Sequence, residues 1–207
     1  MTDLRSVHEI YTRWAFAYDA FTCLTETRSL EAALSGSAVR DGEAVLEVAV
    51  GTGAAFAELL ARNPSGRNVG IDLTEAMLRR ARQKAERTRV PHELAIGDAR
   101  ALCFETGAFD VVINNNMFGL LPEAEFVPIL TELARVLRPG GRLAIVTMGR
   151  PSRRLAAWLY DLVPVWFGGW REIELAPFVL TAGLELVDRR TVEQLGIPSE
   201  VLLAHKR

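Results

Sequence analysis

The sequence predicts an α/β protein with a doubly wound, mostly parallel seven-stranded sheet, a C-terminal antiparallel hairpin and a helical N-terminal extension. Three observations predict this fold class. Short apolar runs alternate with helical segments, which is typical of a parallel sheet with helices on both faces. The runs at residues 44–50 and 142–148 are almost wholly apolar, as in strands buried on both sides. The last two runs flank Gly196-Ile197-Pro198, which favours a hairpin turn.

The elements follow in order along the chain. Aromatic and aliphatic residues at helical spacing predict a helix over residues 5–22, and a short second helix is expected over residues 30–34. Strands are expected over residues 44–50, 68–71, 92–96, 109–114 and 142–148. Helices are expected over residues 54–62, from an N-cap at Thr74 to residue 87, and over 123–137 before Pro139-Gly140-Gly141. The hairpin strands are expected over residues 184–192 and 201–205.

Composition excludes several classes of protein. The chain has 207 residues, of which 49% are hydrophobic and 24% charged, so disorder over most of its length is excluded and one domain is expected. With 24 Lys and Arg against 26 Asp and Glu, it lacks the basic excess of a nucleic-acid-binding protein. No run approaches the ~20 apolar residues of a membrane span, and none resembles a signal peptide, so a cytoplasmic protein is expected.

The cysteines and histidines do not form a metal-binding pattern. Cys23 and Cys103 lie far apart outside any CxxC motif, and His8, His92 and His205 are scattered. We therefore expect no metal and no disulfide framework, with both thiols reduced and packed in the core.

A glycine turn ends the first expected strand, and a carboxylate ends the second. Gly51-Thr52-Gly53 would let the backbone approach a ligand closely, and the two oxygens of Asp72 match the vicinal diol of a ribose. Ligands of doubly wound sheets bind at these strand ends. The pair indicates a nucleoside-containing cofactor, and the alternative is a tight turn followed by a helix-capping acid.

A dinucleotide is one candidate cofactor. Its fingerprint is G-x-G-x-x-G, but Ala54, Ala55 and Phe56 follow the glycine turn, so the third glycine is missing. Two expected helices also precede the first strand. A nicotinamide-dependent oxidoreductase therefore stays as an alternative.

Five segments of the chain together carry a family resemblance. They are VLEVAVGTG at residues 45–53, GIDLTEAML at 70–78, GDA at 97–99, FDVVIN at 109–114 and VLRPGGRL at 136–143. In this order the segments resemble the class I S-adenosylmethionine (SAM)-dependent methyltransferases, particularly the ubiquinone/menaquinone C-methyltransferase branch, and imply their Rossmann-like fold. One position departs, because Ala49 replaces the first glycine of the family's E/D-x-G-x-G-x-G. Alanine is the smallest substitute, so cofactor binding is expected to be kept.

The resemblance implies a set of cofactor-binding residues. Gly51, Thr52 and Gly53 would pass under the methionine part of SAM, and Glu47 would order this loop or reach the ammonium group through water. On the adenosine side, Asp72 would bind the ribose, Leu73 and Met77 would wall the adenine, and Asp98 with the backbone of Ala99 would meet its amino group.

The fourth strand ends in Asn114-Asn115-Asn116-Met117, which in this family borders the transferring methyl group. The amide of Asn114 or Asn115 would suit a polar group of the substrate or the methionine carboxylate. The alternative is an Asn-rich turn. The N/D-P-P-aromatic motif of enzymes that methylate bases is absent here, which counts against nucleic acid as substrate.

The two regions outside the core would cover the cofactor and bind the acceptor. Related enzymes carry a Tyr-Asp element like Tyr18-Asp19 over SAM, so Tyr11 and Tyr18 are expected beside the cofactor, where an aromatic face favours a sulfonium. Plain core packing is the alternative. Residues 155–170 include Trp158 and Trp166, which suit an apolar or aromatic acceptor pocket. The arginines before this segment also allow a transient contact with a membrane surface, and a helix packed on the sheet is the alternative.

The sequence thus predicts one domain over residues 1–207. It comprises a helical cover (1–39), a SAM-binding core (40–148), an acceptor-side insertion (149–183) and the hairpin (184–207). The expected activity is SAM-dependent methylation of a small, apolar or aromatic molecule, with no nucleic acid partner. A non-catalytic SAM-binding protein of the same fold is a further alternative. The sequence singles out no general base and leaves the oligomeric state open.

Overall fold

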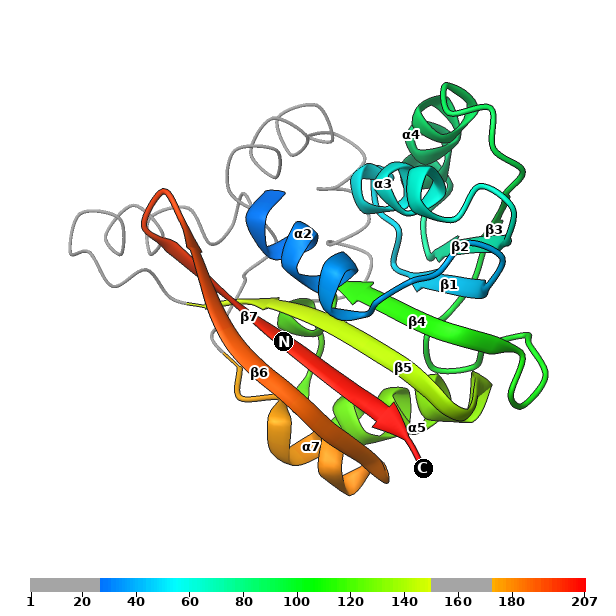
Figure 1. Cartoon of the computed structure of the whole chain (residues 1–207). Coiled ribbons are helices and arrows are strands. Elements are labelled where there is room, and N and C mark those ends of the chain that lie inside the picture. The colour runs from blue at the N-terminus through cyan, green and yellow to red at the C-terminus, as the bar shows by residue number, and fades with distance from the viewer. Residues whose placement is uncertain (1–26, 150–172) are drawn as a thin grey trace.

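The computed structural model describes residues 27–149 and 173–207. In this part of the chain, seven strands form one sheet in the order β3-β2-β1-β4-β5-β7-β6 (Figure 1). The strands are β1 (Ala44–Val48), β2 (Arg67–Asp72), β3 (Glu93–Ile96), β4 (Phe109–Asn115), β5 (Leu137–Met148), β6 (Leu184–Gln194) and β7 (Ile197–Lys206). The helices are α2 (Thr27–Gly36), α3 (Ala54–Arg62), α4 (Glu75–Glu86), α5 (Phe126–Val136) and α7 (Ala176–Thr181). Two 3-10 turns, η1 (Phe118–Leu120) and η2 (Glu123–Glu125), precede α5.

The pairing of the strands confirms the expected fold class. Strands β3, β2, β1, β4 and β5 pair in parallel, and β7 pairs antiparallel with both β5 and β6. The chain leaves β1 in one direction toward β2 and returns on its other side as β4. The carboxyl ends of β1 and β4 therefore flank the point where the strand order reverses, which is where ligands of such sheets bind.

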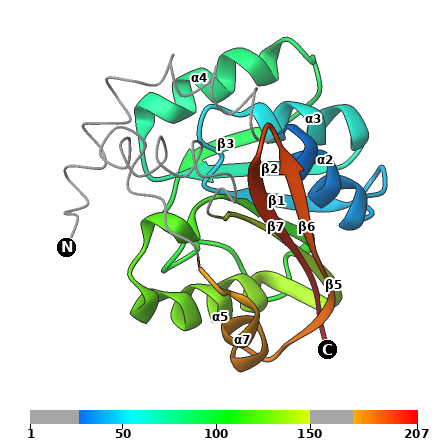
Figure 2. The same ribbon diagram turned by 90° about the vertical axis from the view of Figure 1, so that its left-hand side faces the viewer.

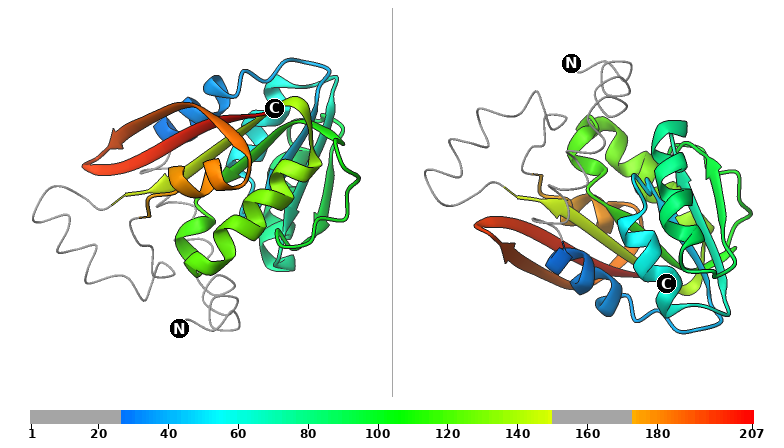
Figure 3. Two further views of the ribbon diagram at one scale, coloured as in Figure 1. Left: turned by 90° about the horizontal axis from the view of Figure 1, so that it is seen from below. Right: turned by 90° about the horizontal axis from the view of Figure 1, so that it is seen from above.

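Helices cover both faces of the sheet, as Figures 2 and 3 show, with α2, α3 and α4 on one face and α5 and α7 on the other. Strand β1 shows how both faces of the sheet are buried. Val45 packs into the core that contains Phe56 of α3, and the next residue, Leu46, packs into the core that contains Phe126 of α5. Both β1 side chains are fully buried. The alternation of a strand thus sends neighbouring apolar residues to opposite cores, which explains the continuous apolar runs.

The hairpin is present, but its turn lies earlier than expected. Leu195 and Gly196 form a two-residue turn with φ values of 53° and 82°, and Ile197 already pairs with Gln194. Two successive residues with positive φ match the twist of the flanking strands. Pro198 therefore belongs to β7.

Two boundaries around α5 also differ. The helix begins at Phe126, because η2 occupies Glu123–Glu125 after Pro122. Strand β5 begins at Leu137, which pairs with Phe109, whereas the next pair joins Val111 to Arg142. The residues between, which include Gly140 at φ +73°, form an irregularity within the strand and do not precede it.

Two further observations concern the surface. Cys103 is exposed, so the expectation of a core thiol was wrong there, and Cys23 lies outside the described residues. Among the residues that the structure describes, no helix combines the length and the apolar character needed to cross a membrane.

Candidate functional site

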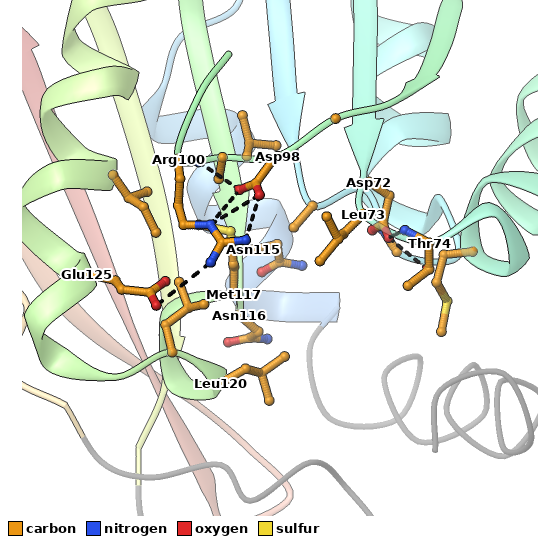
Figure 4. A pocket seen from close by; sticks show the side chains of 18 residues that line it. Asp72, Leu73, Thr74, Asp98, Arg100, Asn115, Asn116, Met117, Leu120 and Glu125 are labelled. Atoms are coloured by element: carbon orange, nitrogen blue, oxygen red, sulfur yellow. Dashed lines mark hydrogen bonds and ion pairs between the residues drawn. The ribbon is translucent and has the colours of Figure 1, made fainter. Parts of the chain in front are cut away.

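A cavity of about 190 Å³ opens at the carboxyl ends of the parallel strands (Figure 4). Its walls are mostly apolar, and its polar groups come from the loops that follow β1, β2, β3 and β4. The lining residues are Val48, Ala49, Gly51, Asp72, Leu73, Thr74, Met77, Gly97, Asp98, Ala99, Arg100, Asn115, Asn116, Met117, Leu120, Leu121, Glu125 and Ile129. A mostly apolar cavity with a few convergent polar groups is the usual form of a small-molecule site.

The glycine turn after β1 contains three residues with a left-handed backbone conformation. Ala49, Gly51 and Gly53 have φ values of 60°, 57° and 82°. Gly53 is also required by space, because a Cβ there would lie 2.6 Å from the Cα of Ala81 in α4. Gly53 therefore lets α3 start against α4, while Gly51 turns the backbone into the cavity.

Asp72 ties this turn to the loop after β2. One carboxylate oxygen accepts the N–H of Gly51 at 2.8 Å, and the other accepts the N–H and the hydroxyl of Thr74, each at 2.9 Å. Thr74 occupies the N-cap position of α4 as expected, but its side chain makes no capping hydrogen bond, because its hydroxyl donates to Asp72. A carboxylate has about four acceptor positions, so Asp72 keeps capacity for a ligand.

Glu47 lies behind the turn and does not line the cavity. Glu47 is 1% exposed, and its Oε2 has no hydrogen-bond partner among the residues that the structure describes. Burial raises the pKa of Glu47 well above its ordinary value, and the nearby charge of Asp72 raises it further. This buried carboxyl group therefore favours its protonated form.

Asp98 is held by a neighbouring arginine. The guanidinium of Arg100 donates to both carboxylate oxygens, with a shortest distance of 2.6 Å, and the Arg100 N–H adds a bond of 2.9 Å (Figure 4). These hydrogen bonds lower the pKa of Asp98. Arg100 also lies 3.9 Å from Glu125, whose Oε2 is buried without a partner. Asp98, the residue that the resemblance assigns to the adenine amino group, is thus hydrogen-bonded to Arg100 in this structure.

The three asparagines after β4 have different surroundings. Asn114 is fully buried and donates to the Val48 carbonyl at 2.9 Å, so its side chain joins β4 to β1 and does not line the cavity. Asn115 and Asn116 both line the cavity. The Oδ1 atoms of Asn114 and Asn115 and both polar side-chain atoms of Asn116 are buried and have no hydrogen-bond partner in the described part of the chain.

The expected site residues fall into three groups. Those that line the cavity are Gly51, Asp72, Leu73, Met77, Asp98, Ala99 and Asn115. Those that support it from behind are Glu47, Thr52, Gly53 and Asn114; Thr52 accepts a hydrogen bond from Lys84 of α4 at 3.1 Å. Tyr11, Tyr18, Trp158 and Trp166 lie outside the described residues.

Sequence reasoning found only part of one wall of the cavity. Asn116 and Met117 belong to the segment that was expected beside the methyl group, whereas five other residues of this wall were not expected: Arg100, Leu120, Leu121, Glu125 and Ile129. Most of these residues follow β4 directly, through η1 and η2 into α5. An apolar segment directly after the end of a parallel strand was the available signal, since it must turn over the ligand-binding edge.

Comparisons with known proteins agree with this geometry. The profile of the methyltransferase domain family matches residues 45–141. The ubiquinone/menaquinone biosynthesis C-methyltransferase of Cereibacter sphaeroides is 34% identical over 161 residues, which are 75% of this chain and 64% of that protein. The demethylmenaquinone methyltransferase of Lactococcus lactis is 30% identical over 162 residues, with the same shares. The chain thus spans 64% of the length of these two curated relatives.

Solved structures share the fold at low sequence identity. A putative methyltransferase of Haloferax volcanii, in complex with the Trm112 methyltransferase activator, has a TM-score of 0.74 at 19% identity and covers 97% of this chain and 98% of its own. The geranyl diphosphate C-methyltransferase of Streptomyces coelicolor, solved with S-adenosylhomocysteine, has a TM-score of 0.71 at 14% identity, covering 88% and 79%. The matching domain, the curated relatives and the shared fold agree with the glycine turn and the two strand-end carboxylates, so residues 45–141 match a methyltransferase domain similar to that of the class I SAM-dependent methyltransferases.

Proposed function

We propose that this chain transfers the methyl group of SAM to a small apolar or aromatic acceptor, and that a quinone precursor is the preferred class. The observation that carries the proposal is the cavity itself. Two carboxylates, Asp72 and Asp98, lie at the ends of neighbouring strands, and between them the walls are apolar. This set matches a nucleoside, whose diol and exocyclic amine are hydrogen-bond donors and whose base is flat and apolar on its faces.

The adenosine end would lie over β2 and β3. Asp72 is 8% exposed and already accepts three hydrogen bonds, so its remaining acceptor position would meet one ribose hydroxyl without rearranging. Leu73 is half exposed and Met77 is buried, and the two side chains would enclose the base. Asp98 would accept from the adenine amine once Arg100 moves away, next to the backbone N–H of Ala99.

The methionine end would lie over the glycine turn. Gly51 brings the backbone to the cavity, and Thr52 and Gly53 hold the turn against α4. Glu47 and Asn114 support it from behind, and the unpartnered Oδ1 of Asn115 would accept a hydrogen bond from the ammonium group. Most of the buried side-chain atoms that lack a partner among the described residues lie in β1, β4 and the turns after β4, beside the cavity, whereas Ser199 Oγ and Glu200 Oε2 lie in β7.

The acceptor would lie against Met117, Leu120 and Ile129, which form an apolar wall. This wall supports an apolar or aromatic molecule, and the names of the curated relatives point to quinones. We extend the proposal to Tyr11 and Tyr18 beside the cofactor and to Trp158 and Trp166 beside the acceptor, on the resemblance alone.

Positioning would account for most of the catalysis. When bound, SAM supplies a methyl group on a positively charged sulfur, which is already activated for in-line displacement. The protein must hold the acceptor in line and exclude water, and effects of this kind need no charged side chain at the reacting atom.

Calorimetric titration with SAM, S-adenosylhomocysteine and NAD tests the cofactor. We expect both sulfur compounds to bind and NAD not to bind. Asp72→Ala should weaken SAM binding roughly 10- to 150-fold, which is about 1.5–3 kcal/mol for hydrogen bonds to a charged group. Asp110→Ala is the matched control, because Asp110 also accepts a backbone N–H at 2.8 Å but lies at the opposite end of β4.

Each result that contradicts the proposal would indicate another function. Tight NAD binding without SAM binding would make the chain an oxidoreductase. Turnover is tested with methyl-labelled SAM and short-chain reduced naphthoquinones and catechols. SAM binding without transfer to any of these acceptors would reject the proposed acceptor class and favour a non-catalytic binding protein.

A further inference from the structure

The residue that follows β4, Asn116, combines three unusual properties. Its backbone is left-handed, with φ +56°. Its side chain is 5% exposed and lines the cavity. Within residues 27–149 and 173–207, neither its amide nitrogen nor its amide oxygen has a hydrogen-bond partner. Buried polar side chains are normally satisfied, so a complete amide without partners, facing a cavity, points to a ligand.

The fold itself does not require an amide at this position. Asparagine tolerates the left-handed region, but glycine adopts it more easily and would bury no polar group. The backbone is fixed independently of the side chain, because the Asn116 N–H donates to the Val146 carbonyl of β5 at 2.8 Å. The backbone of Asn116 is therefore fixed while the hydrogen-bonding capacity of its side chain stays unused.

The position of Asn116 in the sheet indicates whether its amide would bind the cofactor or the acceptor. Asp72 and Asp98, proposed for adenosine, follow β2 and β3 on one side of β1. Asn116 follows β4 on the other side of β1 and is hydrogen-bonded to β5. In Figure 4 its amide is drawn next to Leu120, away from Asp72 and Thr74. The amide thus belongs to the end of the cavity that is left for the acceptor.

The chemistry of the group narrows the acceptor further. A carboxamide presents one accepting oxygen and an NH₂ donor side by side. It pairs with a hydroxyl next to a carbonyl, or with two neighbouring hydroxyls, on a flat ring. The apolar residues Met117 and Leu120 beside it fit the ring.

We propose that Asn116 binds the acceptor through its carboxamide and that it selects aromatic or quinoid molecules with two oxygens on adjacent carbons. This inference rests on the proposed function and names the feature that the acceptor must carry. The amide would fix the rotation of the ring in the cavity, and thereby which ring atom faces the methyl group.

The test compares acceptors that differ by one oxygen. A catechol, a 3-hydroxychromone and their analogues without the second oxygen, a phenol and a chromone, are titrated into the protein saturated with S-adenosylhomocysteine. The KM values of the catechol and the phenol are then measured with SAM. We expect the protein to prefer the two-oxygen acceptors by about tenfold, the size expected from one or two neutral hydrogen bonds. In Asn116→Gly this preference should disappear, with the dissociation constant of SAM within about twofold of the original.

A second variant tests the donor and the acceptor separately. Asn116→Asp keeps the accepting oxygen and loses the NH₂ donor, so it should still bind the catechol and should lose the 3-hydroxychromone, whose carbonyl would face a carboxylate. Thermal unfolding checks that both variants fold, and Asn116→Gly should be no less stable than the parent.

Three results would overturn the inference. One is an oxygen preference in Asn116→Gly equal to that of the parent. A second is a loss of SAM affinity at unchanged acceptor KM, which would assign the amide to the cofactor. The third is parent protein that binds SAM but shows no preference for the two-oxygen acceptors. Failure of the parent to bind SAM would instead reject the proposed function itself.

Discussion

Ala49→Gly should make this protein more stable, although it removes a side chain. Ala49 has φ +60°, in the left-handed region that costs an L-residue about 1–2 kcal/mol. Glycine removes this strain but loses more conformational entropy on folding, which costs roughly 0.5–1 kcal/mol. The net gain in the free energy of unfolding is therefore about 0.5–1 kcal/mol. For a chain of 207 residues, this corresponds to a rise of about 1–4 °C in Tm.

Urea unfolding without cofactor, followed by circular dichroism, measures this difference. Ala38→Gly is the matched control, because Ala38 has φ +48° but is exposed and precedes the start of β1, at the end of the strand opposite the cavity. Both variants should gain stability by similar amounts, and SAM should bind Ala49→Gly at least as well as the parent, since the Ala49 methyl group lines the cavity. A gain for Ala38→Gly together with a loss for Ala49→Gly would refute the reasoning, because the Ala49 methyl would then stabilise the turn by packing.

Two other predictions concern charges at the site. Burial raises the pKa of Glu47, so its contribution to stability is full below its unfolded pKa near 4.5 and is lost as the pH rises toward the folded pKa. Glu47→Gln should therefore flatten the fall of Tm above pH 4.5 and raise Tm at pH 8; an unchanged pH profile would show that Glu47 ionises freely. Arg100→Gln should release Asp98 and tighten SAM binding in a calorimetric titration, because the adenine amine would no longer compete with a guanidinium. Weaker binding would instead mean that Arg100 contacts the cofactor.

The predictable parts of the fold were those in which composition and spacing agree. Helix α3 spans the expected residues 54–62, because Gly53 precedes it and Asn63-Pro64 ends it. The start of β5 was not predictable in this way. The pattern Pro139-Gly140-Gly141 indicates a stop, yet Leu137 before it already pairs with Phe109. A single pair formed across an irregularity depends on the neighbouring strand, and local sequence does not reveal it.

The site shows a similar division. Gly51 and Asp72 could be predicted because strand ends and glycine turns have a fixed relation in parallel sheets. The choice among Asn114, Asn115 and Asn116 could not, because one residue of strand register decides whether an amide bonds β1 or lines the cavity. Arg100 was missed because an arginine two residues after an aspartate resembles an ordinary solvated loop.

The hydrogen bonds of the Asp72 carboxylate couple the local unfolding of the two loops beside the proposed cofactor site. It bonds Gly51 and Thr74, which belong to two loops separated by a helix and a strand. Local unfolding of either loop breaks its hydrogen bond to this anchor and weakens the hold on the other. The two loops should therefore exchange their amide hydrogens as one cooperative unit, and a ligand that binds Asp72 would protect both at once.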